Sequence, residues 1–311
     1  MTEYLNRWLA AGTITPAQHQ ALGALLRRER LSIFIELNAL LYIGVLSFVA
    51  GLAWTASTYS EQWGDAAILV PATAVVCGCF YYCFSRGAPF STGETPARAL
   101  VFDYVLYLGC LVFGFELGYV EYRFNLLQGQ WDYYLLASAI LYFALAYRFD
   151  NRFVLSLGIG TLGGWFGVRV SHAAFVGSVL RVPALAYGTI VGLAGTALHA
   201  REVKRHFTET YLHVAANIVL ATLLSGVFDA PAMSVWFAGL VLASAAAIAG
   251  GVRARRFAFV VYGTVYGYVG VSRELLRALP GVTATMYYFV VSAGLVILGL
   301  VVLSQRFGRE E

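Results

Sequence analysis

Uninterrupted apolar runs make up most of the chain, and most of them are about as long as a bilayer is thick. A helix of about 20 residues crosses the hydrocarbon layer. Inside that layer only helices and closed barrels satisfy their own backbone. A barrel strand alternates apolar and polar residues, whereas these runs are continuously apolar. The sequence therefore predicts an all-α, polytopic membrane helical bundle with about ten transmembrane helices arranged as hairpins. The predicted spans are 33–56, 66–84, 101–120, 132–147, 152–169, 183–198, 211–228, 233–250, 257–279 and 284–303.

The composition agrees with a membrane protein and excludes several other classes. Hydrophobic residues make up 59% of the chain and charged residues 12%, about half the charged fraction of a soluble domain. The basic residues form short clusters between apolar runs, so no basic face is available for nucleic acid. The four cysteines all lie in apolar runs, without zinc-ligand or disulfide spacing. The expected partner is the lipid bilayer.

The basic residues also predict an orientation, because cytoplasmic loops carry an excess of arginine and lysine. If the N-terminus is inside, sixteen basic residues fall on the inner side. The outer side holds five: Arg123, Arg169, Arg181, Arg273 and Arg277. We therefore expect a multi-pass protein of the cytoplasmic (inner) membrane with both termini in the cytoplasm. The first apolar run is too long for a signal-peptide core, so we expect it to remain as an anchor.

The stretch 1–31 precedes the first apolar run and is predicted to be a cytoplasmic pair of amphipathic helices, separate from the transmembrane bundle at 32–311. Thr15 and Gln18 have the spacing of a capping box at the start of the second helix. A hairpin this small does not fold alone. We expect Trp8 and Leu22, on its apolar stripes, to dock on a protein partner, a second subunit or the bundle itself.

One segment of the chain is repeated. A shift of 65 residues aligns 38–84 with 103–149 without a gap, with 11 identities in 47 positions. Both copies run in the same direction, so the unit is a helical hairpin. In this alignment Glu116 stands opposite Gly51. The carboxylate is therefore an addition to one copy.

Glu116 is the first candidate for a functional residue. It lies about 8 Å from the centre of its span by helix rise, where a carboxylate costs on the order of 2–3 kcal/mol. Arg273 has a similar estimated depth, and with Arg169 and Glu274 it completes a candidate buried polar cluster. Glu116 binds an ion or proton in one interpretation. In the other it pairs with a neighbouring helix, while the other three side chains reach the interface.

No pattern of catalytic, cofactor-binding or metal-binding residues is found. The sequence contains no nucleophile triad, zinc-protease motif or phosphate-binding loop. His199, His206 and His213 recur every seven residues, but the first two fall in a predicted cytoplasmic loop. Paired haem ligands would have to face each other from different helices. We therefore predict no catalytic, cofactor or metal residue, which makes an intramembrane enzyme the least supported class.

Two stretches resemble a known family. The segment Leu5–Leu22, LNRWLAAGTITPAQHQAL, is similar to the W-x3-G-x-I-T-x2-Q opening of the domain-of-unknown-function 2157 family of bacterial integral membrane proteins. The segment Ala146–Gly167, AYRFDNRFVLSLGIGTLGGWFG, is similar to the central part of that family. The resemblance implies a cytoplasmic hairpin followed by many spans, and it implies no reaction.

Two functions remain open. The number of spans, the hairpin repeat and the intramembrane charges favour transport or handling of a small solute, ion or lipid. The alternative is a non-catalytic scaffold or sensor whose hairpin at 1–31 mediates oligomerisation or partner binding. Small residues at close spacing, such as Gly188, Gly192 and Gly195, suit an intramolecular core or a homo-oligomer seam equally well.

Overall fold

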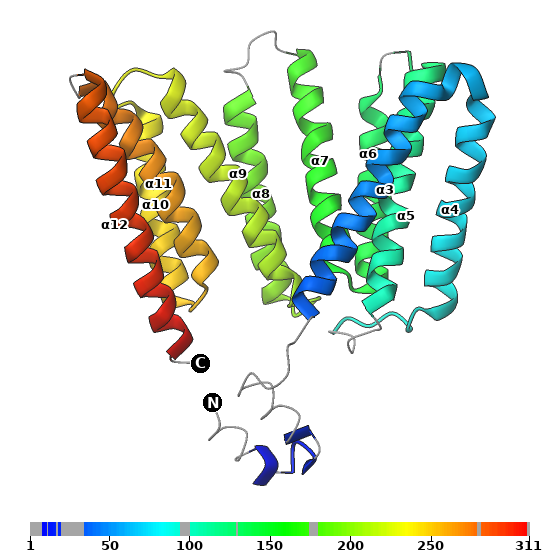
Figure 1. Cartoon of the computed structure of the whole chain (residues 1–311), viewed down its shortest axis with the longest axis horizontal. Coiled ribbons are helices and arrows are strands. Elements are labelled where there is room, and N and C mark those ends of the chain that lie inside the picture. Colours follow the sequence, from blue (N-terminus) through cyan, green and yellow to red (C-terminus); the bar gives the residue numbers. More distant parts are fainter. Residues whose placement is uncertain are drawn as a thin grey trace. The chain divides into compact units, whose positions relative to one another are not determined.

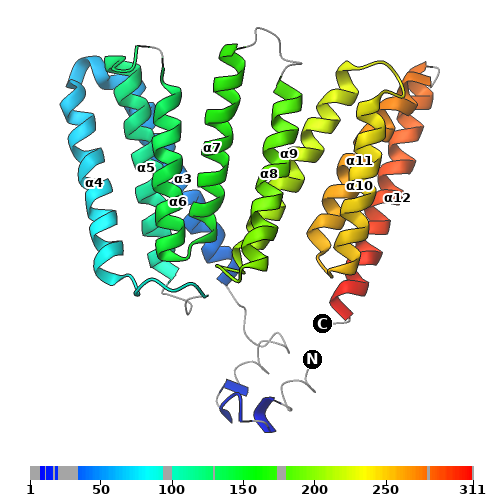
Figure 2. The same cartoon turned by 180° about the vertical axis from the view of Figure 1, so that it is seen from behind.

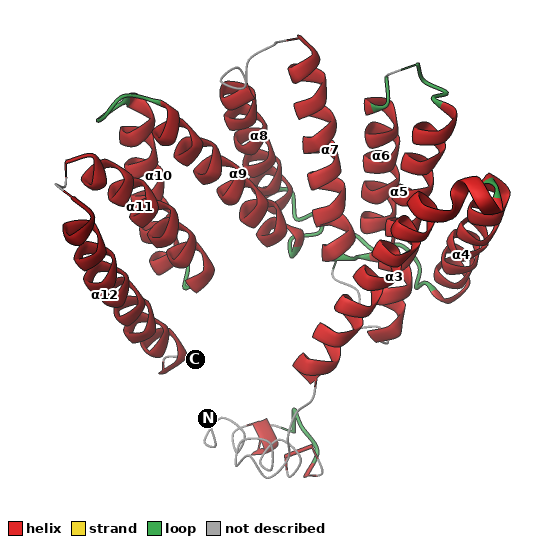
Figure 3. Cartoon of the chain, turned by 45° about the horizontal axis from the view of Figure 1, so that its top comes forward, coloured by secondary structure: helices red, strands yellow, loops and turns green. Residues whose placement is uncertain are grey.

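The structure is a computed structural model that describes residues 8–10, 12–16, 18–19, 34–93, 100–128, 130–173, 180–278 and 281–309. Ten long α-helices account for most of these residues (Figures 1 and 3). They are α3 (Phe34–Trp63), α4 (Asp65–Arg86), α5 (Leu100–Phe124), α6 (Asp132–Phe149), α7 (Arg152–Ala173), α8 (Arg181–Ala200), α9 (Phe207–Asp229), α10 (Val235–Arg253), α11 (Phe257–Ala278) and α12 (Gly281–Arg309).

The helices confirm the predicted all-α polytopic bundle. Among the described residues, eight helices are long and apolar enough to cross a membrane. α6 and α11 are outside that set, so their crossing remains a prediction. Each of the ten predicted ranges nevertheless overlaps one of the ten helices.

The chain divides into two compact units, 1–71 and 72–311. In the first unit the predicted capping box is confirmed. The Thr15 backbone N–H donates to Oε1 of Gln18 at 2.8 Å, and the Gln18 N–H donates to Oγ1 of Thr15 at 3.2 Å. Trp8 is 49% exposed, while Leu22 lies outside the described residues. Docking of this segment therefore remains a prediction.

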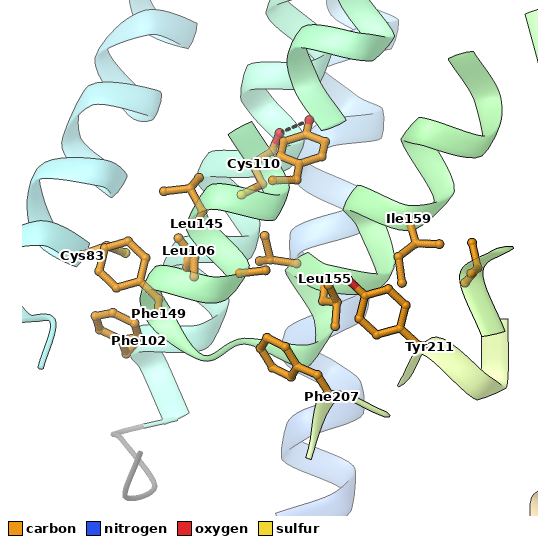
Figure 4. Packing of buried hydrophobic residues seen from close by; sticks show 14 of the residues in the cluster. Cys83, Phe102, Leu106, Cys110, Leu145, Phe149, Leu155, Ile159, Phe207 and Tyr211 are labelled. Atoms are coloured by element: carbon orange, nitrogen blue, oxygen red, sulfur yellow. Dashed lines mark hydrogen bonds between the residues drawn. The ribbon is translucent and has the colours of Figure 1, made fainter. Parts of the chain in front are cut away.

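In the second unit, successive helices pack as antiparallel neighbours (Figures 1 and 2). α5 contacts α6 and α7, α9 contacts α7, α8, α10 and α11, and α12 packs on α11. A buried cluster around Leu106, Cys110, Phe149 and Leu155 joins α5, α6 and α7 (Figure 4). At Gly109 an added Cβ would lie 2.9 Å from the Cβ of Cys79. Glycine is therefore required where α4 approaches α5.

α12 leaves its apolar side chains uncovered. Met286, Val290, Leu295 and Ile297 are all exposed. A soluble monomer rarely exposes a large contiguous apolar patch. In a bilayer such side chains can face lipid tails, which are as apolar as leucine. The surface of this helix is therefore that of a lipid-facing segment.

A buried charge pair joins three connections at one end of the second unit, which we call the Lys204 end. Lys204 is 1% exposed, and its Nζ lies 3.1 Å from Oδ1 of Asp150. The same oxygen is 2.5 Å from Nε2 of His206. The Lys204 ammonium also donates to the Gly93 carbonyl at 3.2 Å, and its backbone N–H donates to the Thr92 carbonyl at 2.9 Å. The segment 87–93, the α6–α7 turn and the α8–α9 turn are thereby held together.

The α6–α7 turn consists of two residues that cap both helices. Asp150 ends α6 in the left-handed conformation, at φ 56°. The side-chain oxygen of Asn151 accepts from the N–H groups of Phe153 and Val154 at 3.0 and 2.9 Å, as an N-cap does. Its amide donates to Asp103 of α5 at 2.8 Å. The turn therefore also fixes the start of α5.

The buried pair predicts a large effect of Lys204→Met on stability. Removal of the cation leaves the buried Asp150 carboxylate without its main counter-charge, which costs about 3–5 kcal/mol. Thermal unfolding of the purified protein should show this loss of stability. The double variant Lys204→Met, Asp150→Asn should regain part of the lost stability. Arg201→Gln, an exposed cation in the same turn, should change stability by less than about 0.5 kcal/mol. Equal melting temperatures for the wild type and Lys204→Met would contradict the role of the pair.

Candidate functional site

The residues of the predicted polar cluster have separate partners. The Glu116 carboxylate on α5 accepts a hydrogen bond from the Thr73 hydroxyl on α4. Arg273 on α11 lies over the ring of Phe228, with its guanidinium carbon 5.7 Å from the centroid. α11 packs against α9, α10 and α12, whereas α5 packs against α6 and α7. Among the described residues, therefore, Glu116 and Arg273 are not brought together.

Arg169 of α7 forms an ion pair with Asp132 of α6. Its Nη1 lies 3.4 Å from Oδ2 of Asp132, and its Nη2 donates to the hydroxyl of Tyr133 at 3.0 Å. Asp132 is 1% exposed. That oxygen accepts no hydrogen bond of good geometry among the described residues. The arginine is therefore its charge partner across the α6–α7 interface.

Glu274 fixes a turn. Its carboxylate accepts from the backbone N–H of Met233 at 3.2 Å and from Arg277 at 3.1 Å. Arg277 in turn donates to the carbonyl of Ala230 at 2.8 Å. These bonds tie the α9–α10 turn to the last turns of α11. The role of Glu274 in the structure is therefore to hold this connection.

A cavity of about 790 Å³ is formed by α5, α6 and α7. We call it the α5–α6–α7 cavity. Its apolar wall consists of Leu111, Gly114, Leu117, Gly118, Leu135 and Leu157. The polar groups come from Glu121, Asn125, Ser138, Tyr142 and Thr161. A few polar groups within an apolar wall are typical of small-molecule sites.

Glu121 is the charged group of the cavity. It is 9% exposed, and its Oε2 accepts from the backbone N–H of Leu127 at 3.2 Å. A carboxylate offers about four acceptor positions, so this bond leaves capacity for a ligand. Ser138 is also buried, and the Tyr142 hydroxyl donates to the Cys110 carbonyl at 2.8 Å. The cavity can therefore hold an apolar body and bind a hydrogen-bond donor at one end.

Sequence reasoning missed Glu121, although a signal was present. Gly114, Gly118 and Glu121 are spaced by four and three residues, which places them on one helical face. Two small residues open space beside a helix, and a carboxylate at the next step of the same face then borders that space. The depth of a residue in its predicted span favoured Glu116, which does not line the cavity.

Comparison with known families bears on the first half of the chain. A family model described as "Predicted membrane protein (DUF2157)" matches residues 6–155. Residues 6–155 are similar to the DUF2157 family. The match confirms the resemblance inferred from the sequence. The DUF2157 region contains the N-terminal segment and α3 to α6, and so most residues of the α5–α6–α7 cavity. Neither a curated protein nor a solved structure matches the chain.

The contacts of two arginines predict different effects of the same substitution. Arg169→Gln leaves buried Asp132 without its charge partner, and an unsatisfied buried acceptor costs about 1–3 kcal/mol. Arg273→Gln removes a cation–π contact that contributes about 0.5–1 kcal/mol. In thermal unfolding, Arg169→Gln should therefore have a lower melting temperature than Arg273→Gln. Adding Asp132→Asn to Arg169→Gln should restore much of the lost stability. The reverse order would contradict the Asp132–Arg169 pair.

Proposed function

We propose that this protein binds and handles a lipid or another small amphipathic molecule within the bilayer, with the α5–α6–α7 cavity as its binding site. The observation that carries the proposal is a buried carboxylate, Glu121, at the edge of a large and mainly apolar cavity. A site of this kind separates two tasks: its apolar wall holds a hydrocarbon body, and its polar groups fix the orientation.

The volume and the wall favour a ligand with a hydrocarbon portion. The leucines at 111, 117, 135 and 157 supply apolar surface from all three helices. Burial of such a ligand contributes roughly 25 cal/mol per Å² of apolar surface relative to water. A ligand that already resides in the bilayer gains less from this term. Polar recognition within the cavity must then account for selectivity.

Glu121 favours a head group that donates hydrogen bonds or carries positive charge. A carboxylate in a low-dielectric site is costly unless it is paired. Its bond from Leu127 N–H satisfies one acceptor position. An ammonium or hydroxyl group on a ligand would satisfy a further one, and hydrogen bonds to charged groups contribute about 1.5–3 kcal/mol. An amphipathic amine is therefore the best probe of the site.

The orientation of the chain is the second part of the proposal. The excess of basic residues near the Lys204 end supports placing that end, and both termini, in the cytoplasm. The α5–α6–α7 cavity, which reaches Asn125 and Trp131 at the opposite end of the helices, would then face the outer half of an inner membrane. Handling of a ligand from the outer leaflet follows from this placement.

The ligand proposal is tested by comparing dodecylamine with dodecanol, which share one hydrocarbon length. The protein is kept in detergent, and each probe is added below its critical micelle concentration. Dodecylamine should then raise the wild-type melting temperature more than dodecanol does. Glu121→Gln should remove this preference, because its affinity for dodecylamine should fall by about tenfold or more. The matched control is Glu116→Gln, the same substitution five residues earlier and outside the cavity, and it should keep the preference. An equal response of Glu121→Gln and wild type would refute the proposal.

The orientation is tested in intact cells by adding one cysteine at a time to the chain, which already contains four. Met233→Cys lies in the exposed α9–α10 turn, and Thr92→Cys lies exposed at the Lys204 end. A membrane-impermeant thiol reagent added outside should label Met233→Cys and not Thr92→Cys, with the wild-type protein as the measure of background. Labelling of Thr92→Cys alone would mean that the chain is inserted the other way round.

A further inference from the structure

A second cavity, of about 370 Å³, lies at the Lys204 end and has a different chemistry. We call it the cationic cavity. It gathers the start of α7, the end of α8, the α8–α9 turn, the first turn of α9 and the α10–α11 turn. Its charged residues are Arg152, Glu202, Arg205, Glu209 and Arg256, with His199 and His206 beside them. All of these except Arg152 lie outside the region matched by the DUF2157 family.

The charges of the cationic cavity are unevenly paired. Arg152 lies 3.8 Å from Glu209, and the other carboxylate oxygen of Glu209 lies 3.7 Å from His213. That carboxylate is therefore already shared. Within the described part of the chain, Arg205 and Arg256 form no ion pair with either carboxylate of the cavity. The lining thus contains three guanidinium groups and two carboxylates, and one of these carboxylates is already shared.

The arginines are held by backbone that is itself fixed. Arg205 directly follows Lys204, whose ammonium and backbone are both bonded. The Arg256 N–H donates to the Gly251 carbonyl at 2.8 Å, which closes the end of α10. Arg152 follows the capping residue Asn151. A site whose backbone is fixed in advance loses less conformational entropy when a ligand binds.

We propose that the cationic cavity binds the phosphate group of an anionic ligand, with Arg205 and Arg256 as its main contacts. The planar guanidinium fork matches phosphate oxygens with two parallel hydrogen bonds. Arg201, Arg253 and Arg255 are exposed at the same end, and they raise the local concentration of anions. A lipid head group and a soluble phosphate compound share this chemistry. The site does not depend on the α5–α6–α7 cavity or on the function proposed for it.

The experiment measures binding to the full-length protein in detergent by thermal shift, with two kinds of probe. One arm adds dioleoyl phosphatidic acid in mixed micelles against dioleoyl phosphatidylcholine. The other adds inorganic phosphate against chloride at equal ionic strength. The variants are Arg205→Gln, Arg256→Gln and their combination. The control is Arg253→Gln, which removes an exposed arginine that does not line the cavity.

Phosphatidic acid should stabilise the wild type more than phosphatidylcholine does, and the double variant should bind it at least about tenfold more weakly. Arg253→Gln, which changes a residue outside the cavity, should weaken binding much less than the double variant does. Stabilisation by inorganic phosphate alone, lost in the double variant, would keep the site and assign it to a soluble phosphate compound. Equal losses in Arg253→Gln and the double variant, or no loss in either, would overturn the proposal. If the double variant fails to fold, the single variants give the same comparison.

Discussion

The buried ion pair of Lys204 and Asp150 is the contact on which one end of the bundle depends. Burial of two charges is costly, and their attraction offsets this only when further hydrogen bonds satisfy the remaining atoms. His206 bonds the Asp150 carboxylate, and the Gly93 carbonyl accepts from the Lys204 ammonium. The Thr92 carbonyl accepts from the Lys204 backbone N–H and so holds the residue in place. The pair joins connections that are far apart in the sequence. The chain contains no other lysine, so its ammonium is used where a compact cation with several donors is needed.

This anchor affects both cavities. The α6–α7 turn that contains Asp150 sets how α6 and α7 lie against α5, and the α5–α6–α7 cavity is formed by those three helices. The α8–α9 turn that contains Lys204 places Arg205 and Glu209 in the cationic cavity. One contact thus joins the turn between two helices of the α5–α6–α7 cavity to a turn that lines the cationic cavity. The two cavities differ in polarity, since the first has a mainly apolar wall and the second is lined by charged residues.

The sequence could predict the helices because lipid imposes a single rule on length and apolarity. It could also predict the capping box at Thr15, since that motif follows from local chemistry. The neighbours of a helix do not follow from that rule. Glu116 and Arg273 have matching depths by helix rise, yet they lie on helices with different neighbours. Depth fixes one coordinate of a side chain, and the face and the partner helix fix the others.

A structure determined in lipid nanodiscs would test the central claim that the α5–α6–α7 cavity is a binding site. We expect elongated density along Leu117 and Leu135, with its polar end within about 3.2 Å of the Glu121 carboxylate, a hydrogen-bond distance. Closure of α5 onto α6, or water alone beside Glu121, would contradict it.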